Sequence, residues 1–260
     1  TLAAMNNLAL QLGNEGHFNE AEMLHRRALD QWERVSGTED PQTLMCMNNL
    51  GLLLNNQGRH REAEEVHQKT LELREKVLGP EHRDTLISMN NLALAYGSLG
   101  RNAEAEKVHR QALELKKKVL GLDDPSTLTT MNNLAGVLRD QGKLSEAEDL
   151  HRDEFRRCES TLGLDHLDTL VSVTSLAVVL KDQGKYQQAE FFMSQAVLRC
   201  TNVLGAYHPL TITNVNNLAD ALGGQGKFEQ AVEIYQKALT SGEKMLGRNH
   251  PITVAARANL

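Results

Sequence analysis

The chain has 260 residues, of which 40% are hydrophobic, 24% are charged and only 4% are aromatic. Its formal net charge of −6 argues against a nucleic-acid partner, because such a surface needs a concentrated basic stripe. No apolar run reaches the roughly 18 residues of a membrane-spanning helix, so we expect no membrane partner either.

One frame of 42 residues repeats along the whole chain. It begins at Thr1, Thr43, Thr85, Thr127, Thr169 and Thr211, without insertion or deletion, and a partial copy begins at Thr253. A constant period of this size indicates a stacked repeat array. We expect a single array over residues 1–260, with units near 1–42, 43–84, 85–126, 127–168, 169–210 and 211–252 and a partial unit at 253–260. Because both ends lie inside the frame, we expect the array to be a fragment of a larger protein.

Each unit predicts two helices. In the second unit Asp40-Pro41 is a helix-start signal, and apolar residues from Leu44 onward recur at spacings of three and four. Gly58 ends this helix, because glycine readily takes the left-handed conformation after a helix. A second helix follows and ends at Gly79. Since the connections are short, consecutive helices pack antiparallel, and the predicted fold is all-α.

Small residues recur where the two helices of a unit are expected to cross. On the first helices they are Gly51, Ala93, Ala135, Ala177 and Ala219, and on the second helices Ala21, Ala63, Ala105, Ala147, Ala189 and Ala231. This order of leucines, small residues and turn glycines resembles the tetratricopeptide repeat. The 42-residue step, the Asn-Asn-Leu-Ala string and the Val-Leu-Gly ending resemble more closely its kinesin light chain-like class.

This resemblance implies a right-handed superhelix, or α-solenoid, of antiparallel helix pairs. It also implies that the first helices line a concave groove that holds a peptide or a partner protein. The same repeat class occurs in kinesin light chains and in the sensor regions of NLR-type signalling receptors of fungi and bacteria. The even repetition of the present chain resembles the receptor arrays more than the kinesin adaptors.

Paired asparagines mark the first helix of five units, at Asn6-Asn7, Asn48-Asn49, Asn90-Asn91, Asn132-Asn133 and Asn216-Asn217. Asparagine is a mediocre helix-interior residue, so the pairs need a reason beyond helix formation. Two interpretations stay open, a ladder of amides that binds the backbone of an extended peptide and a hydrogen-bond spine between repeats. The resemblance implies that the second asparagine contacts the peptide more often. The candidate groove residues are therefore Asn49, Asn91, Asn133 and Asn217, with Asn48 and Asn90 beside them.

Arg139 and Lys181 lie one period apart on the same expected face, and each is followed by an aspartate. They predict a basic step for an acidic side chain of the ligand, although solvated surface charge is the simpler explanation. Neighbouring first-helix positions vary between units, for example Met45 against Ile87 and Leu52 against Leu94. Such variation on a constant frame is typical of a binding surface and also of any exposed face.

Four histidines, His25, His67, His109 and His151, occupy one second-helix position in successive units. Zinc needs ligands that converge within about 2.1 Å of one point, so histidines a repeat apart are packing residues and we expect no metal site. Glu154 stands where four of the other units have alanine and one has threonine, and a packed carboxylate needs a partner. His151, one turn earlier, is the nearest candidate.

The fifth unit departs most from the frame. It replaces the asparagine pair with Thr174-Ser175 and carries Phe191, Phe192 and Met193 in its second helix. Local rules fail most often at functional or strained sites, so this unit is a second candidate for function. A relaxed unit with a tilted second helix is the alternative.

No catalytic set stands out from the frame, so we expect neither an enzyme nor a cofactor. Cys158 and Cys200 are one period apart in the sequence, which places them roughly 10 Å apart, too far for a disulfide. Free thiols, together with the lack of a secretory signal, indicate a cytoplasmic chain. The leading hypothesis is a protein-interaction or ligand-sensing domain of an NLR-like receptor, with a protein or peptide ligand. Alternatives are a kinesin light chain-like cargo adaptor and a scaffold that self-associates through its uncapped ends.

Overall fold

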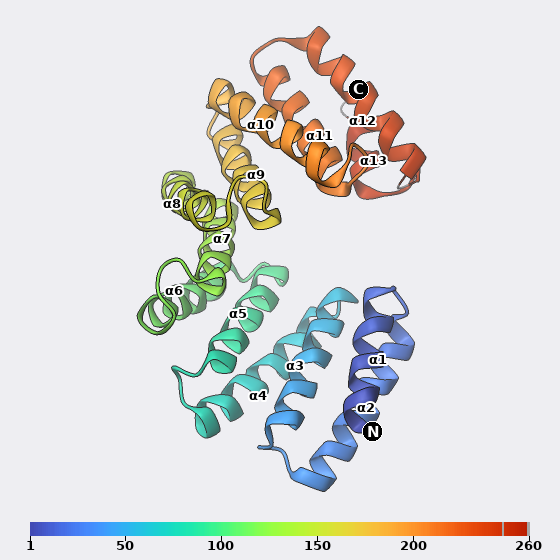
Figure 1. Ribbon diagram of the computed structural model, residues 1–260, viewed down its shortest axis with the longest axis vertical. Helices are drawn as coiled ribbons and strands as arrows, with labels where there is room; N and C mark the ends of the chain where they lie inside the picture. The colour runs from blue at the N-terminus through green and yellow to red at the C-terminus, as the bar shows by residue number, and fades with distance from the viewer. Residues whose placement is uncertain (246, 259–260) are drawn as a thin grey trace. The chain divides into compact units, whose positions relative to one another are not determined.

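The computed structural model describes residues 1–245 and 247–258, and this part of the chain is built of helices joined by short connections, without a strand (Figure 1). The helices are α1 (Leu2–Asn14), α2 (Phe18–Ser36), α3 (Pro41–Asn56), α4 (His60–Leu78), α5 (Arg83–Ser98), α6 (Asn102–Val119), α7 (Pro125–Asp140), α8 (Leu144–Leu162), α9 (Leu167–Asp182), α10 (Tyr186–Leu204), α11 (Pro209–Gly224), α12 (Phe228–Met245) and α13 (Pro251–Ala258). The predicted all-α fold of antiparallel helix pairs is confirmed. Odd-numbered helices are the first helices of the pairs, and even-numbered helices are the second.

The residues form two compact units, Thr1–Val137 and Leu138–Leu260. In the first unit α1 to α6 pack each against the next, and in the second unit α8 to α13 do the same. First helices also contact the first helices of the next pair, α1 with α3 and α3 with α5 in one unit, and α9 with α11 and α11 with α13 in the other. Within each unit the first helices therefore form a continuous surface.

The starts of the first helices are tied down by local hydrogen bonds. The Asp40 carboxylate accepts from the Gln42 amide at 2.9 Å, as the Asp-Pro signal predicts. Where the frame has histidine instead, at His82, His166 and His208, the ring nitrogen Nδ1 accepts the equivalent bond at 3.1 to 3.2 Å. Histidine is thus a functional cap in this frame, although it is not among the usual capping residues.

The frame threonine holds the preceding turn. Thr43 Oγ1 donates to the Gly37 carbonyl at 2.8 Å, and Thr85, Thr127 and Thr211 make the same bond to their own glycines. Gly37 has a φ of 89°, a left-handed conformation that other residues adopt only with strain. The constant Gly and Thr of the frame are therefore explained by the turn alone.

The predicted small residues are buried at the crossing of each helix pair, and Ala63, Ala93 and Ala177 expose none of their surface. Gly51 shows why size matters, because a Cβ built there would lie 2.5 Å from Cε1 of His67. The His67 ring therefore packs directly on the backbone of α3. Each helix pair buries its apolar stripe only with the help of its neighbours, as a repeat array requires.

Candidate functional site

The paired asparagines form a ladder of hydrogen bonds between successive first helices. The second asparagine of each repeat donates through Nδ2 to Oδ1 of the first asparagine of the repeat before it. The distances are 3.4 Å for Asn49 to Asn6, 2.9 Å for Asn91 to Asn48 and 3.1 Å for Asn133 to Asn90. The spine between repeats, one of the two interpretations of the pairs, is therefore present. Each of these bonds uses one of the two amide protons of its donor.

The ladder has no counterpart in the fifth repeat. Thr174 is buried there, and its hydroxyl donates to the Leu170 carbonyl of its own helix at 2.7 Å. In the sixth repeat Asn216 is buried and Asn217 is half-buried. The ladder formed by these three bonds thus belongs to the first unit, on α1, α3, α5 and α7.

Apolar side chains flank the ladder on its exposed side. Met45 and Leu52 lie one turn before and one turn after the asparagine pair of α3 and are 38% and 37% exposed. Leu94 continues the row on α5 at 37%, and the half-buried Ile87 precedes the asparagine pair of that helix. Spacings of three, four and seven place these residues on one helix face. Asn49, Asn90 and Asn133 are half-buried beside these apolar side chains, whereas Asn48 and Asn91 are buried.

The two cations predicted to receive an acidic ligand already have carboxylate partners. Lys181 Nζ lies 2.7 Å from an oxygen of Asp220 on α11. The Arg139 guanidinium lies 2.9 Å from Asp140 and 3.8 Å from Asp182. An acidic side chain of a ligand would have to compete with these aspartates. The basic step stays a prediction.

The histidine column is buried in the helix pairs. His25, His67, His109 and His151 are at most 2% exposed, and burial lowers the pKa of His67, His109 and His151 to about 4. Their rings are therefore neutral at pH 7. In the described part of the chain, no three His, Cys, Asp or Glu side chains gather closely enough to hold a metal ion.

Glu154 is buried, but its predicted partner was wrong. Its carboxyl accepts from Ser172 Oγ on the next helix and from Cys158 Sγ at 3.4 Å, rather than from His151. His151 and Glu154 are three residues apart and so lie on the same face of α8, but the Glu154 carboxyl is directed toward Ser172 of α9. Burial raises the pKa of Glu154 to about 7.

Buried cations between repeats were missed from the sequence. Arg74 is 4% exposed and donates to Ser88 Oγ at 2.8 Å, and Lys116 is 2% exposed and donates to Thr130 Oγ1 at 2.7 Å. Both pairs are 14 residues apart, as are Cys200 and Asn214, whose amide donates to the thiol at 3.4 Å. In the sequence, such pairs can be found as two polar residues that stand 14 positions apart, at two positions of the frame that vary between repeats.

Comparison with protein families places the chain in a known class. The tetratricopeptide repeat model matches residues 1–76, 47–118, 99–160, 126–197 and 173–244, which together span most of the chain. A search of curated proteins gave no match. In the described residues no helix is both long enough and apolar enough to cross a bilayer.

Solved structures have the same fold. A putative kinesin light chain of Podospora anserina, made of nearly identical TPR-like repeats, is 27% identical over 79% of this chain and 98% of its own, with a TM-score of 0.69. BtubC (BKLC) from P. vanneervenii is 19% identical over 90% of this chain and 94% of its own, with a TM-score of 0.73. NprR, solved with its cognate peptide NprX, is 18% identical over 98% of this chain and 72% of its own, with a TM-score of 0.64.

Proposed function

We propose that this chain, which belongs to the tetratricopeptide repeat family, holds an extended segment of a partner protein along the first helices of its first unit. The observation that carries the proposal is the asparagine ladder with exposed apolar side chains on its flank. Candidate contacts are the half-buried Asn49 and Asn133 through their second amide proton, with Asn217 as the equivalent residue of the second unit. Asn91 is buried, so a contact there requires the ligand to approach the helix closely.

The spacing of the repeats suits an extended chain. Packed helices lie about 8 to 10 Å apart, whereas an extended peptide advances about 3.3 Å per residue. Successive amides of the ladder therefore meet the ligand backbone about every third residue. Met45, Leu52 and Leu94 provide apolar contacts between these points. The fitting ligand is a peptide with uncharged apolar side chains, and its affinity depends little on salt because the proposed contacts are amides and apolar side chains.

Two kinds of larger protein could contain this array, an adaptor and a receptor. The name of the Podospora protein, putative kinesin light chain, favours an adaptor. The NLR-like receptor stays a prediction from the evenness of the repeats. Both settings use the same binding surface, and neither needs catalysis.

A random-peptide library displayed on phage tests the binding surface. The chain is immobilised, bound peptides are recovered, and their affinities for variants are measured by titration calorimetry. Leu52→Glu with Leu94→Glu places two carboxylates beside the ladder, and we expect affinity to fall at least about tenfold, because apolar anchors dominate such interfaces.

The matched control is Val77→Glu with Val119→Glu. These valines are 41% exposed at equivalent positions of the second helices α4 and α6, away from the ladder. The control should keep the affinity of the wild-type chain. Peptides that bind the Leu52 and Leu94 variant as well as the wild type would place the site elsewhere and overturn the proposal.

A further inference from the structure

The outer face of α10 differs from those of the other second helices. In the described part of the chain, α10 alone among the second helices has no fully exposed charged residue, since Glu190 and Arg199 are half-buried. Each of these two side chains is paired with an opposite charge of the same chain at the surface: Glu190 accepts from Lys227 at 2.9 Å, and Arg199 lies 3.0 Å from Asp165. Phe191 and Leu198, seven residues apart and thus on one side of the helix, are 61% and 57% exposed. Depletion of charge and exposed aromatic residues are typical of interface cores.

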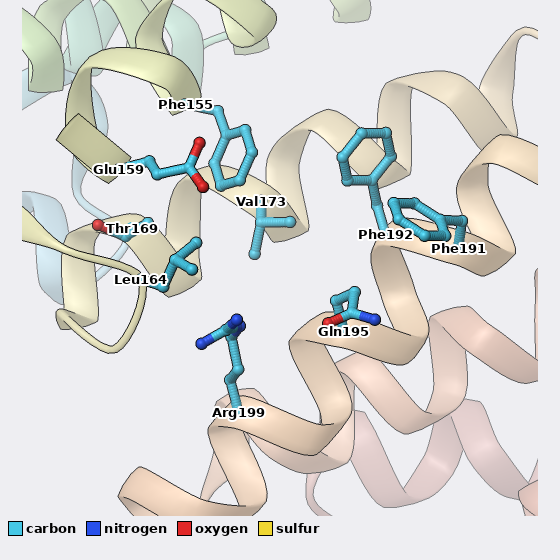
Figure 2. Close-up of a pocket in the computed structure, with 9 residues that line it drawn as sticks. All are labelled: Phe155, Glu159, Leu164, Thr169, Val173, Phe191, Phe192, Gln195 and Arg199. Atoms are coloured by element: carbon cyan, nitrogen blue, oxygen red, sulfur yellow. The ribbon is translucent and has the colours of Figure 1, made fainter.

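A pocket of about 300 Å³ opens beside this face. Phe155 of α8, Val173 of α9 and both Phe191 and Phe192 of α10 line it, with Leu164 from the connection between α8 and α9 (Figure 2). The charged side chains of Glu159 and Arg199 also line the pocket. The Phe192 ring stands edge-on to Phe155 at 6.1 Å and to Phe191 at 5.3 Å between ring centroids. The pocket and the exposed Phe191 ring thus belong to one surface of the second unit.

The frame explains why the pocket is present. The position of Val173 holds methionine in the first four repeats, at Met5, Met47, Met89 and Met131. Valine is shorter, so it leaves space that the methionine side chain would fill. In addition, the Thr169 hydroxyl has no partner among the described residues, as is also the case for Thr253, whereas Thr43, Thr85, Thr127 and Thr211 bond to the turn glycine. The turn that carries Leu164 therefore lacks the hydrogen bond that holds the turns of those four repeats.

The position of Phe191 is equally distinctive. Equivalent residues in the other repeats are Met23, Glu65, Lys107, Asp149 and Glu233. Four of these five are charged, as suits a solvated helix face. A phenylalanine in this place exposes apolar surface that only a binding partner would bury.

We infer that the α10 face binds a second copy of this chain, and that the Phe191 ring of each copy enters the pocket of the other. A two-fold symmetric interface must be self-complementary, and this surface carries both the projecting ring and the pocket that can receive it. Charge favours the same face. Each copy has a net charge of −6, so two acidic surfaces would repel, whereas both charged side chains of α10 are paired with an opposite charge of their own copy and two α10 faces can meet without net repulsion between these pairs. The inference does not rest on the proposed peptide site, which consists of residues on the first helices of the other unit.

Sedimentation velocity over a concentration series tests the inference. We expect the wild-type chain to pass from monomer to dimer between about 1 μM and 1 mM, and to stop at the dimer because a two-fold interface is closed. Phe191→Glu introduces the residue that the second and sixth repeats carry at this exposed position, so it leaves the fold intact. It should raise the dimer dissociation constant at least about tenfold.

Val173→Met fills the pocket with the residue of the first four repeats and should weaken the dimer as well, without loss of helical signal or of stability. The matched control is Lys107→Glu, which changes charge at the position equivalent to Phe191 on α6 and should leave the dimer unchanged. A wild-type chain that stays monomeric up to about 1 mM would overturn the inference. So would a dimer that Phe191→Glu leaves intact, or growth beyond the dimer, which points to stacking of open ends.

Discussion

Among single side chains, Glu154 shows the effect of an ionisable group at a packed position of the frame. A carboxyl stands where most repeats have alanine, and burial raises its pKa to about 7. It is therefore largely protonated in the folded chain at pH 6, where an unfolded glutamate, with a pKa near 4.3, is ionised. The neutral carboxyl satisfies Ser172 and Cys158, and no cation among the described residues compensates its ionised form.

Glu154 makes the free energy of unfolding fall as pH rises. Below the unfolded pKa of about 4.3 the carboxyl is neutral in both states, and the cost of burying it appears between that value and about 7. Glu154→Gln imitates the protonated acid at every pH. We expect the variant to match the wild type at pH 5 within about 1 kcal/mol and to exceed it by about 1 to 3 kcal/mol at pH 8. Urea unfolding at the two pH values measures the difference, and an equal difference at both would contradict the assignment.

The asparagine ladder predicts coupling between residues 43 positions apart. Asn48→Ala and Asn91→Ala each break the 2.9 Å bond, so the double variant should lose less stability than the sum of the single variants. We expect a coupling of about 0.5 to 1.5 kcal/mol in urea unfolding. Asn48 with Asn133 is the matched pair without a shared bond, since Asn133 donates to Asn90, and its coupling should be near zero.

Among helices, the histidine column links stability to acid. The pKa of His67, His109 and His151 is about 4 in the folded chain and about 6.5 in the unfolded chain, so protons bind the unfolded state first. The free energy of unfolding should therefore fall as pH drops from about 6.5 to about 4, by up to about 3 kcal/mol for each histidine.

Replacing His109 and His151 by Met reduces this acid sensitivity. Methionine is the residue of the fifth repeat at this position, and the first-helix position that faces it in the frame is alanine in all three repeats, at Ala93, Ala135 and Ala177. The variant should lose less stability between pH 7 and pH 5 than the wild type in urea unfolding. An unchanged slope would show that other groups control acid unfolding.

The helices were predictable because their signals are local. Each of these signals acts within one or two helical turns: the Asp-Pro start, the turn glycines and the three-and-four spacing of leucines. The alanines indicate where two helices cross. The partners of Glu154, Arg74 and Lys116 were not predictable in the same way. Ser172, Ser88 and Thr130 lie on the following helix, and which residue becomes the partner depends on the angle at which two helices cross.

The candidate site was predictable only in part. Asn91 and Asn133 were found from the pattern, but a pattern on one helix cannot decide whether an amide faces a ligand or the next repeat. The structure gives each a neighbour in the preceding repeat. The aromatic residues of the fifth repeat were noticed from the sequence, whereas the pocket was not, because it arises from the loss of a methionine side chain at Val173.

For the chain as a whole, two surfaces with different chemistry follow from one frame. The first helices of the first unit combine amides with exposed apolar side chains, and the second helix α10 combines a bare aromatic ring with a pocket. The repeated scaffold keeps its turns and crossings constant, so single substitutions at exposed positions are enough to give each repeat its own surface. The proposed sites for a partner segment and for a second copy of the chain therefore use different residues.

The location of the peptide is the central claim, and site-specific photo-crosslinking tests it most directly. A photoreactive phenylalanine analogue is placed at Leu52 or Leu94 beside the ladder, and at Val77 or Val119 on the second helices as the control. A peptide recovered from the phage library is then added and irradiated, and adducts are identified by mass spectrometry. The account predicts adducts from positions 52 and 94 and none from positions 77 and 119. Adducts confined to positions 77 and 119 would contradict it.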